Sequence, residues 1–299
     1  MAHKLSIITP SYNQGRFIKR TIESVLSQHF SGSLEYLVMD GGSNDETVGI
    51  LRRYEASLSW VSEKDDGQAD AVNKGLSRAT GEIIGWLNSD DIYYPDAIVA
   101  VCDAFDSDPT LDVIYGDANH IDEDDRIIEA YPTEDGDFSR LVNTCYICQP
   151  AAFFRKSVVD RFGPLDANLQ YCLDYEYWVR LAAAGAKFRR LRRVLAGSRL
   201  YPQTKTLGSR VRVHAEINDM LRRYARRVPD QWLFNYAHAV LDERGIPRSD
   251  GIRFPLLVGL LSFYSALRWN RRISLLMAKT VRVWTGAALQ ALWRRKGSR

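Results

Sequence analysis

The N-terminal third of the chain alternates short apolar runs with segments whose apolar residues recur every three or four positions. The apolar runs occupy residues 5–9, 36–39, 58–61 and 83–87. After the first run, Phe17, Ile18, Ile22 and Val25 have the spacing of one helix face. Strand and helix alternating in this way predict an α/β domain, with a mostly parallel sheet flanked by helices and a Rossmann-like nucleotide-binding half.

Each predicted strand ends in a polar turn, at residues 9–13, 40–45, 65–67 and 88–91. Ligands of parallel sheets bind beyond the carboxyl ends of the strands. We therefore expect these four turns to line one crevice.

Two adjacent carboxylates, Asp90 and Asp91, follow the fourth strand. Neighbouring carboxylates repel one another and lose hydration unless a cation or several donors face them, so a divalent metal is one expected partner. The alternative is an ordinary turn and helix N-cap.

The first turn contains no G-x-G-x-x-G or P-loop pattern, which argues against dinucleotide and P-loop folds. Thr9, Ser11 and Tyr12 instead offer hydroxyl and aromatic groups that suit a base and a ribose. Asp40 is positioned to accept from a pyrimidine N–H or a ribose hydroxyl. The alternative for Thr9 and Asp40 is a helix cap or turn former.

Charge is distributed unevenly along the 299 residues. Residues 1–150 contain 11 Lys+Arg against 27 Asp+Glu, and residues 151–299 contain 29 against 10, so the halves carry −16 and +19. The acidic half suits a metal site, and the basic half suits a phosphate-bearing substrate or a membrane surface. The basic residues form no recognisable nucleic-acid module, so nucleic acid is not an expected partner.

The four cysteines lack disulfide-framework spacing, and Cys145 and Cys148 form a lone C-x-x-C. Buried thiols in a reducing, cytoplasmic compartment are expected rather than zinc ligands. The N-terminus lacks the apolar run of a signal peptide, and no apolar run reaches the ~18–20 residues that span a bilayer.

Four motifs in order resemble family 2 glycosyltransferases with the GT-A fold, over about residues 5–206. They are Thr9-Pro10-Ser11-Tyr12-Asn13, Asp40-Gly41-Gly42-Ser43-Asn44-Asp45, Asp65-Asp66-Gly67-Gln68 with Asn73-Lys74-Gly75, and Asn88-Ser89-Asp90-Asp91.

The resemblance implies that Thr9, Tyr12 and Asp40 hold the nucleoside of a nucleotide sugar. Further donor contacts are expected from Ser11, Asp66, Asn73 and Asn88, which lie in the same motifs. Asp90 and Asp91 correspond to the D-x-D element, which binds Mn²⁺ or Mg²⁺ bridging the diphosphate. Asn88 and Val72 depart from the family, because they stand where many members have the first Asp and a donor-contacting Arg.

Asp174 stands at the second position of the family's E-D element, the catalytic base of inverting members, and Leu173 replaces the Glu. The alternative for Asp174 is an N-cap. In the segment that resembles the closing loop, Arg199 and Lys205 are expected phosphate contacts or solvated charges. Tyr201 stands where many relatives have a metal-ligating His, and a phenol of pKa ~10 is a poor metal ligand.

Residues 122–125 form an acidic stretch between two predicted strands, 118–121 and 126–131. This pattern predicts a hairpin with a solvated tip.

The C-terminal region, residues 207–299, is expected to be helical and separate from a catalytic domain of residues 1–206. Its last fifty residues contain ten Lys+Arg and one acidic residue. From about residue 252 the pattern is basic, amphipathic and Trp-bearing, which suits an anionic membrane surface. The alternatives are a helical hairpin packed on the catalytic domain and a dimer contact.

Together these features predict an inverting, metal-dependent glycosyltransferase. It would move a sugar from a UDP-, GDP- or dTDP-sugar to a glycan or lipid-linked glycan, in making cell-surface polysaccharide or lipopolysaccharide at the cytoplasmic membrane face. The alternative is a nucleotidyltransferase-like or non-catalytic nucleotide-sugar-binding relative. The former would need a Gly-rich first loop with Arg and Lys, and the latter would not need Asp174.

Overall fold

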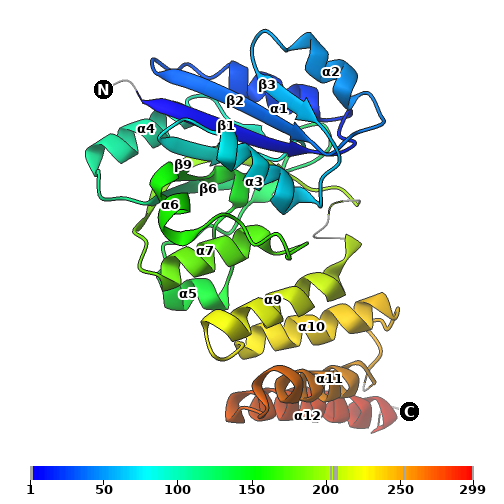
Figure 1. Cartoon of the computed structure of the whole chain (residues 1–299). Helices are drawn as coiled ribbons and strands as arrows, with labels where there is room; N and C mark the ends of the chain where they lie inside the picture. The colour runs from blue at the N-terminus through cyan, green and yellow to red at the C-terminus, as the bar shows by residue number, and fades with distance from the viewer. Residues whose placement is uncertain (1–2, 203, 205–207, 252, 298–299) are drawn as a thin grey trace. The chain divides into compact units, whose positions relative to one another are not determined.

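A computed structural model describes residues 3–202, 204, 208–251 and 253–297, except for the side chains of residues 289 and 291–297. The chain divides into two compact units, Met1–Pro202 and Gln203–Arg299 (Figure 1).

The first unit is built on one sheet with the strand order β3-β2-β1-β4-β8-β6-β9-β5, in which β7 pairs with β6. The strands are β1 (Lys4–Ser11), β2 (Ser33–Asp40), β3 (Ser59–Ser62), β4 (Ile83–Trp86), β5 (Ile92–Tyr93), β6 (Val113–Ile121), β7 (Ile127–Ala130), β8 (Ala152–Arg155) and β9 (Phe188–Arg199). Strands β3, β2, β1 and β4 are parallel, which confirms the predicted parallel half. Beyond β4 the sheet is mixed, because β8 runs antiparallel to both β4 and β6.

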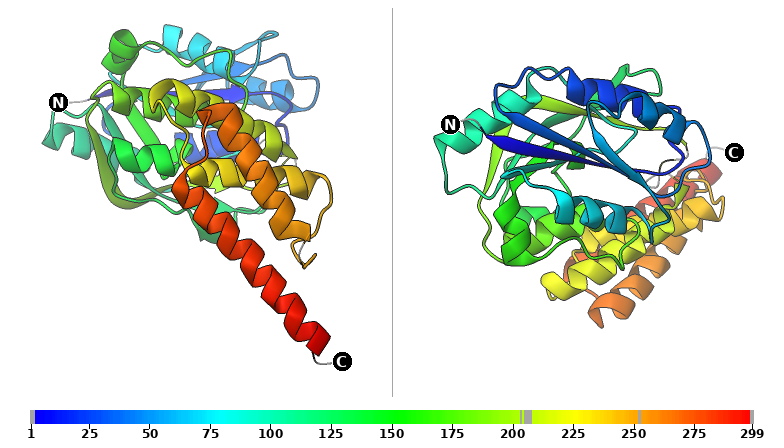
Figure 2. Two further views of the ribbon diagram at one scale, coloured as in Figure 1. Left: turned by 90° about the horizontal axis from the view of Figure 1, so that it is seen from below. Right: turned by 45° about the horizontal axis from the view of Figure 1, so that its top comes forward.

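Helices cover both faces of this sheet (Figure 2). They are α1 (Ile18–Leu26), α2 (Thr47–Arg53), α3 (Gln68–Arg78), α4 (Ala97–Ser107), α5 (Phe138–Asn143), α6 (Lys156–Phe162) and α7 (Leu173–Ala183), with a 3₁₀ turn η1 (Gln149–Ala151). Strand β1 is buried from Leu5 to Ser11 because its alternate side chains face helices on either side. Buried thiols are confirmed for Cys102, Cys148 and Cys172.

The second unit contains α9 (Arg210–Tyr224), α10 (Asp230–Glu243), α11 (Arg253–Asn270) and α12 (Leu275–Gly297), which confirms the predicted helical C-terminal region. Helix α10 packs against α9 and α11, and α11 packs against α12. Leu241, Phe254 and Val258 form a small core with Trp284 against it. Within the described residues, no helix is both long and apolar enough to cross a membrane.

Candidate active site

The turns after β1 and β2 are joined by hydrogen bonds. The amide of Asn13 donates to Ser43 Oγ (2.7 Å), the amide of Asn44 donates to Asn13 Oδ1 (2.9 Å), and the amide of Gly15 donates to Asp45 Oδ2 (2.9 Å). Asn13 has φ 52°, a left-handed conformation that Asn tolerates. Two of the four predicted turns are therefore one connected structure.

Asp40 holds the second of these turns. Its carboxylate is 2% exposed and accepts four hydrogen bonds, from the amides of Gly42 and Ser43 and from the hydroxyls of Ser43 and Ser62. A carboxylate has about four lone-pair sites, so these donors saturate it. The geometry favours the turn-forming alternative over the predicted contact with a nucleoside.

The predicted nucleoside residues of β1 differ in accessibility. The buried Thr9 hydroxyl lies 3.3 Å from the hydroxyl of Tyr36, inside the core. Ser11 is also buried, and its Oγ has no hydrogen-bond partner among the residues that the structure describes. Tyr12 is 60% exposed and presents its ring beside the strand end. Of these three side chains, that of Tyr12 is the accessible one.

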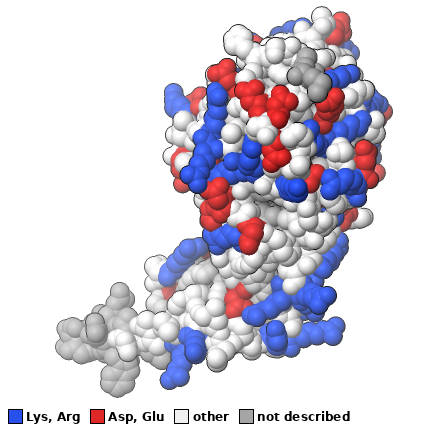
Figure 3. All heavy atoms as spheres, turned by 90° about the vertical axis from the view of Figure 1, so that its left-hand side faces the viewer, with Lys and Arg blue, Asp and Glu red and all other residues white. Residues whose placement is uncertain are grey.

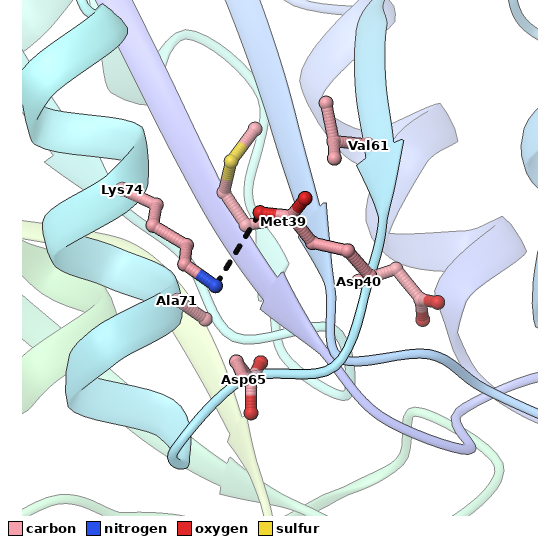
Figure 4. A pocket seen from close by; sticks show the side chains of 7 residues that line it. Met39, Asp40, Val61, Asp65, Ala71 and Lys74 are labelled. Carbon is pink, nitrogen blue, oxygen red and sulfur yellow. Dashed lines mark ion pairs between the residues drawn. The ribbon is translucent and has the colours of Figure 1, made fainter.

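A hollow lies at the ends of β2 and β3 (Figure 4). It is lined by Met39, Asp40, Val61, Glu63, Asp65, Ala71 and Lys74. Lys74 reaches into it from α3 and pairs with Glu63 at 3.4 Å.

Asp65, and not the predicted Asp66, lines this hollow. Burial raises the pKa of Asp65. A Cβ on Gly41 would lie 2.6 Å from Asp65 Oδ2, so the second turn needs glycine there. Asp66 is exposed, and its amide donates to Asp70 Oδ2 at the start of α3. The motif contains both carboxylates, and the sequence alone does not show which of them turns inward.

In this structure the side chain of Asn73 takes part in a contact within the protein, and not in the predicted contact with a nucleotide-sugar donor. Its amide group exchanges two hydrogen bonds, both 2.9 Å, with the backbone N–H and C=O of Leu165. Asn73 therefore fastens α3 to the segment after α6.

The side chain of Asn88 makes four hydrogen bonds in and around the turn after β4. Its Oδ1 accepts from Gln68 Nε2 (2.8 Å) and Trp86 Nε1 (2.9 Å). Its Nδ2 donates to Gln149 Oε1 (2.8 Å) and Asp91 Oδ2 (3.3 Å). With all four positions used, Asn88 orients Asp91 and has no donor or acceptor left for a ligand.

Asp90 and Asp91 have different environments. Asp91 is 4% exposed, and its Oδ1 accepts from the backbone amide of Arg199 at 2.8 Å. Burial, followed by the charge of Asp90, raises the pKa of Asp91 well above its usual range. Asp90 is only partly buried, and its Oδ2 accepts from the hydroxyl of Tyr201 at 2.9 Å.

Arg199 holds this acidic turn from the inside. Its fully buried guanidinium donates to the carbonyls of Asp90 (2.7 Å) and Asp122 (2.5 Å) and pairs with Asp125. The predicted contact of Arg199 with a phosphate is therefore wrong for this arrangement, because the guanidinium is buried and directed into the protein. Lys205 lies outside the described residues.

The acidic hairpin tip is part of the same network. Strands β6 and β7 form the predicted hairpin. Asp125 pairs with Arg20 (2.9 Å) as well as with Arg199, and Glu123 pairs with Arg16 (2.5 Å). Asp124 remains 70% exposed. The expectation of a solvated tip is thus wrong for Asp125, whose partners come from α1 and β9.

Tyr201 takes a specific position beside Asp90. Its hydroxyl donates to Asp90 and accepts from Gln14 Nε2 (3.3 Å), and its ring lies 5.0 Å from that of Phe17. The Arg199 guanidinium lies 4.8 Å from the same Phe17 ring. Tyr201 and Arg199 thus pack around one aromatic side chain next to the carboxylates.

The donor set of Asp90 and Asp91 fits a hard divalent cation. Over the part of the chain that the structure describes, no group of three or more His, Cys, Asp or Glu could hold a metal on its own. Mg²⁺ sites commonly use one or two carboxylates together with substrate phosphates. Burial and the charge of Asp90 raise the pKa of Asp91, and a bound cation would lower it.

Asp174 lies in the first turn of α7, where Cys172 and not Asp174 occupies the N-cap. Burial raises the pKa of Asp174. Burial, with smaller contributions from Asp91, Cys145 and Asp174, also raises the pKa of Cys148. Asp91 on the acidic turn and Asp174 at the start of α7 thus both lie near enough to the Cys148 thiol to affect its pKa.

Sequence comparison covers the region that forms most of these loops. The family model described as Glycosyl transferase family 2 matches residues 6–163. An uncharacterized glycosyltransferase of Mycobacterium tuberculosis is 30% identical over 184 residues, or 60% of this chain and 70% of that protein. Chondroitin synthase of Escherichia coli is 29% identical over 60% of this chain and 27% of its own length. A PGL/p-HBAD biosynthesis glycosyltransferase of Mycobacterium bovis is 28% identical over 66% of this chain and 77% of its own.

Solved structures share the fold at low sequence identity. Staphylococcus aureus TarS 1–349 in complex with UDP-GlcNAc superposes with a TM-score of 0.62 at 16% identity, over 96% of this chain and 92% of that one. The mannosyltransferase PcManGT of Pyrobaculum calidifontis, in complex with GDP-Man and Mn²⁺, gives 0.61 at 18% identity, over 100% and 84%. The family match spans the turns after β1, β2, β3 and β4, and on that evidence this chain belongs to glycosyl transferase family 2, with the GT-A fold.

Proposed function

We propose that this chain is a metal-dependent, inverting glycosyltransferase that moves a sugar from a nucleotide diphosphate to a hydroxyl of a glycan or lipid-linked glycan. We assign the catalysis to the unit Met1–Pro202. The observation that carries the proposal is the acidic turn after β4, where Asp91 accepts from the Arg199 amide and Asp90 from the Tyr201 hydroxyl, within the region of the family match. A pair of carboxylates for a metal and a separate carboxylate for proton transfer are the groups that this reaction needs.

The hollow at β2 and β3 is the proposed nucleoside site. Asp65 supplies an acceptor for a ring N–H, and the exposed Tyr12 ring supplies a stacking surface. Uracil, guanine and thymine all carry a ring N–H, which agrees with a UDP-, GDP- or dTDP-sugar. TarS was solved with UDP-GlcNAc and PcManGT with GDP-Man, so neighbours of the same fold take donors of two of these kinds.

The turn after β4 is the proposed metal and diphosphate site. Asp90, the more exposed carboxylate, would hold Mn²⁺ or Mg²⁺ together with Asp91. When bound, such an ion neutralises charge that develops on the leaving diphosphate. Asn88 and Arg199 keep the two carboxylates in place, since both donate hydrogen bonds to this turn. Tyr201 holds Asp90 from the side through its hydroxyl.

Asp174 is the proposed general base. Its raised pKa makes the carboxylate a better proton acceptor than an exposed Asp. Asp174 takes the proton of the acceptor hydroxyl, whose oxygen bonds to the anomeric carbon while the bond from that carbon to the diphosphate oxygen breaks. Attack from the face opposite the diphosphate inverts the configuration of the sugar.

The test is a screen of UDP-, GDP- and dTDP-sugars with Mn²⁺ or Mg²⁺, read by release of nucleoside diphosphate. We expect release with one class of donor, and we expect EDTA to abolish it. A nucleotidyltransferase would instead combine a nucleoside triphosphate with a sugar 1-phosphate and release pyrophosphate, so that pair of substrates is assayed in parallel. Pyrophosphate release, or full activity in EDTA, would refute the proposal.

A further inference from the structure

Helix α11 carries an exposed apolar ridge. Leu256, Leu260, Tyr264 and Leu267 are 47%, 64%, 56% and 53% exposed, and they follow one another at intervals of three and four residues. That spacing places them on one face of the helix. The opposite face holds the buried Phe254 and Val258, which pack in the core of the helical unit. The exposed ridge is therefore not part of the face by which α11 packs into the core of the helical unit.

The start of α12 continues this pattern. Leu275, Leu276 and Val283 are 72%, 67% and 67% exposed, and the exposed Lys279 and Arg282 lie between them in sequence. Exposed apolar positions of this size and number in one helical pair indicate an interaction surface.

Every charged residue within α11 and α12 is basic. Arg253, Arg268 and Arg271 are exposed at the two ends of the α11 ridge. The sequence contains no Asp or Glu after Asp250. In the view of Figure 3, blue side chains predominate over red on the helical unit, whereas both colours are mixed on the catalytic unit.

We infer that this basic apolar face, formed by the exposed residues of α11 and the start of α12, binds the surface of an anionic membrane. Leucine and tyrosine side chains enter the interfacial region while arginine and lysine reach the headgroups. A second copy of the chain is a poorer occupant, because a two-fold contact would bring the same cationic rim against itself. The inference deepens the proposed function, since it names the surface through which the enzyme reaches a lipid-linked acceptor.

The experiment is co-sedimentation of the full chain with phosphatidylcholine vesicles that contain phosphatidylglycerol, with phosphatidylcholine alone as reference. We expect binding to the anionic vesicles that weakens with added salt. The double variant Leu260→Gln and Tyr264→Gln should reduce partitioning about tenfold or more, because both side chains lose apolar burial. Ile127→Gln with Ile128→Gln on β7 is the matched control, since these residues are 61% and 54% exposed.

A second pair of variants tests the charges. Lys279→Glu with Arg282→Glu should reduce binding at least about 25-fold, because each cation near an anionic leaflet contributes roughly fivefold, or about 1 kcal/mol. Arg52→Glu with Arg53→Glu, exposed on α2, changes the net charge equally and should have little effect.

Failure to bind anionic vesicles, or equal binding by the ridge variant and its control, would overturn the inference. Sedimentation that shows a dimer of the full chain and a monomer of the ridge variant would also overturn it, in favour of a self-association face. Nucleoside diphosphate release from a soluble donor is measured in parallel. If the unaltered chain releases nucleoside diphosphate but does not bind anionic vesicles, this inference alone is refuted, whereas absence of release refutes the proposed function.

Discussion

The substitution Asp125→Asn tests whether the β6–β7 hairpin stabilises the turn after β4, the proposed metal site, through the ion pair with Arg199. Asp125 is the shared partner of the fully buried Arg199 and the partly buried Arg20. Its φ of 68° lies in the left-handed region, which Asn tolerates as well as Asp, so the backbone should be preserved. The variant keeps the shape of the side chain and removes the charge.

The expected cost follows from the environment of the pair. Removing one partner of a fully buried ion pair costs about 3–5 kcal/mol. Asp125 is 31% exposed, and an Asn oxygen still accepts a hydrogen bond, so we expect about 2 kcal/mol. For a unit of this size that loss lowers the melting temperature by about 4–8 °C. Because Arg199 also donates to the Asp90 carbonyl and the Asp91 carboxylate, the apparent affinity for Mn²⁺ should fall in parallel.

Thermal melting and a Mn²⁺ titration of nucleotide binding measure the two effects. Asp124→Asn is the matched control on the same tip, since Asp124 is 70% exposed and pairs with an equally exposed Arg126. An exposed pair of this kind contributes little. If Asp125→Asn has the same melting temperature as Asp124→Asn, the hairpin does not stabilise the turn after β4 and the reasoning is wrong.

Three further outcomes concern the carboxylates. Asp90→Ala should abolish turnover and weaken metal-dependent nucleotide binding measured by calorimetry, because Asp90 is the more accessible of the two proposed ligands. Tyr201→Phe removes the hydroxyl that competes with a metal ion for Asp90 and keeps the ring packed on Phe17. The apparent Mn²⁺ affinity should therefore rise by up to about tenfold, and an unchanged or weaker affinity would contradict this. Burial raises the pKa of Asp174, and only the ionised carboxylate can act as the base. We therefore expect kcat/KM to fall as the pH drops through the pKa of Asp174, which lies above the usual ~3.9 of Asp. A kcat/KM that stays constant down to pH 4 would contradict the role of Asp174 as general base.

The strand-end turns could be predicted because they depend on local pattern. Short apolar runs located the parallel strands, the 3.6-residue period located their helices, and polar residues after each strand marked the edge that carries the proposed site. Which side chain at that edge faces a ligand was less predictable. Asp40 and Asp66 were expected to contact the donor, but the Asp40 carboxylate is saturated by hydrogen bonds within the protein, and Asp65 lines the hollow in place of Asp66.

The internal supports could not be predicted, because their partners lie far apart in sequence. Arg20 and Arg199 meet Asp125 across 105 and 74 residues. The two hydrogen bonds between Asn73 and Leu165 span 92 residues. Charge patterning alone treats such residues as solvated, since it contains no information on which distant strand or helix will lie beside them.

The account's central claim is that Asp174 removes the acceptor proton at a site where Asp90 and Asp91 hold the metal and diphosphate. Single-turnover transfer and nucleotide affinity of Asp174→Asn test it most directly, because Asn keeps the shape of the side chain and cannot accept the proton. Asp166→Asn, at a carboxylate that accepts from the backbone amide and side chain of Asn168, is the control. We predict that Asp174→Asn binds the donor normally and transfers sugar about 10²–10⁴ times more slowly than the unaltered chain. A transfer rate within a few-fold of the unaltered chain would contradict the claim.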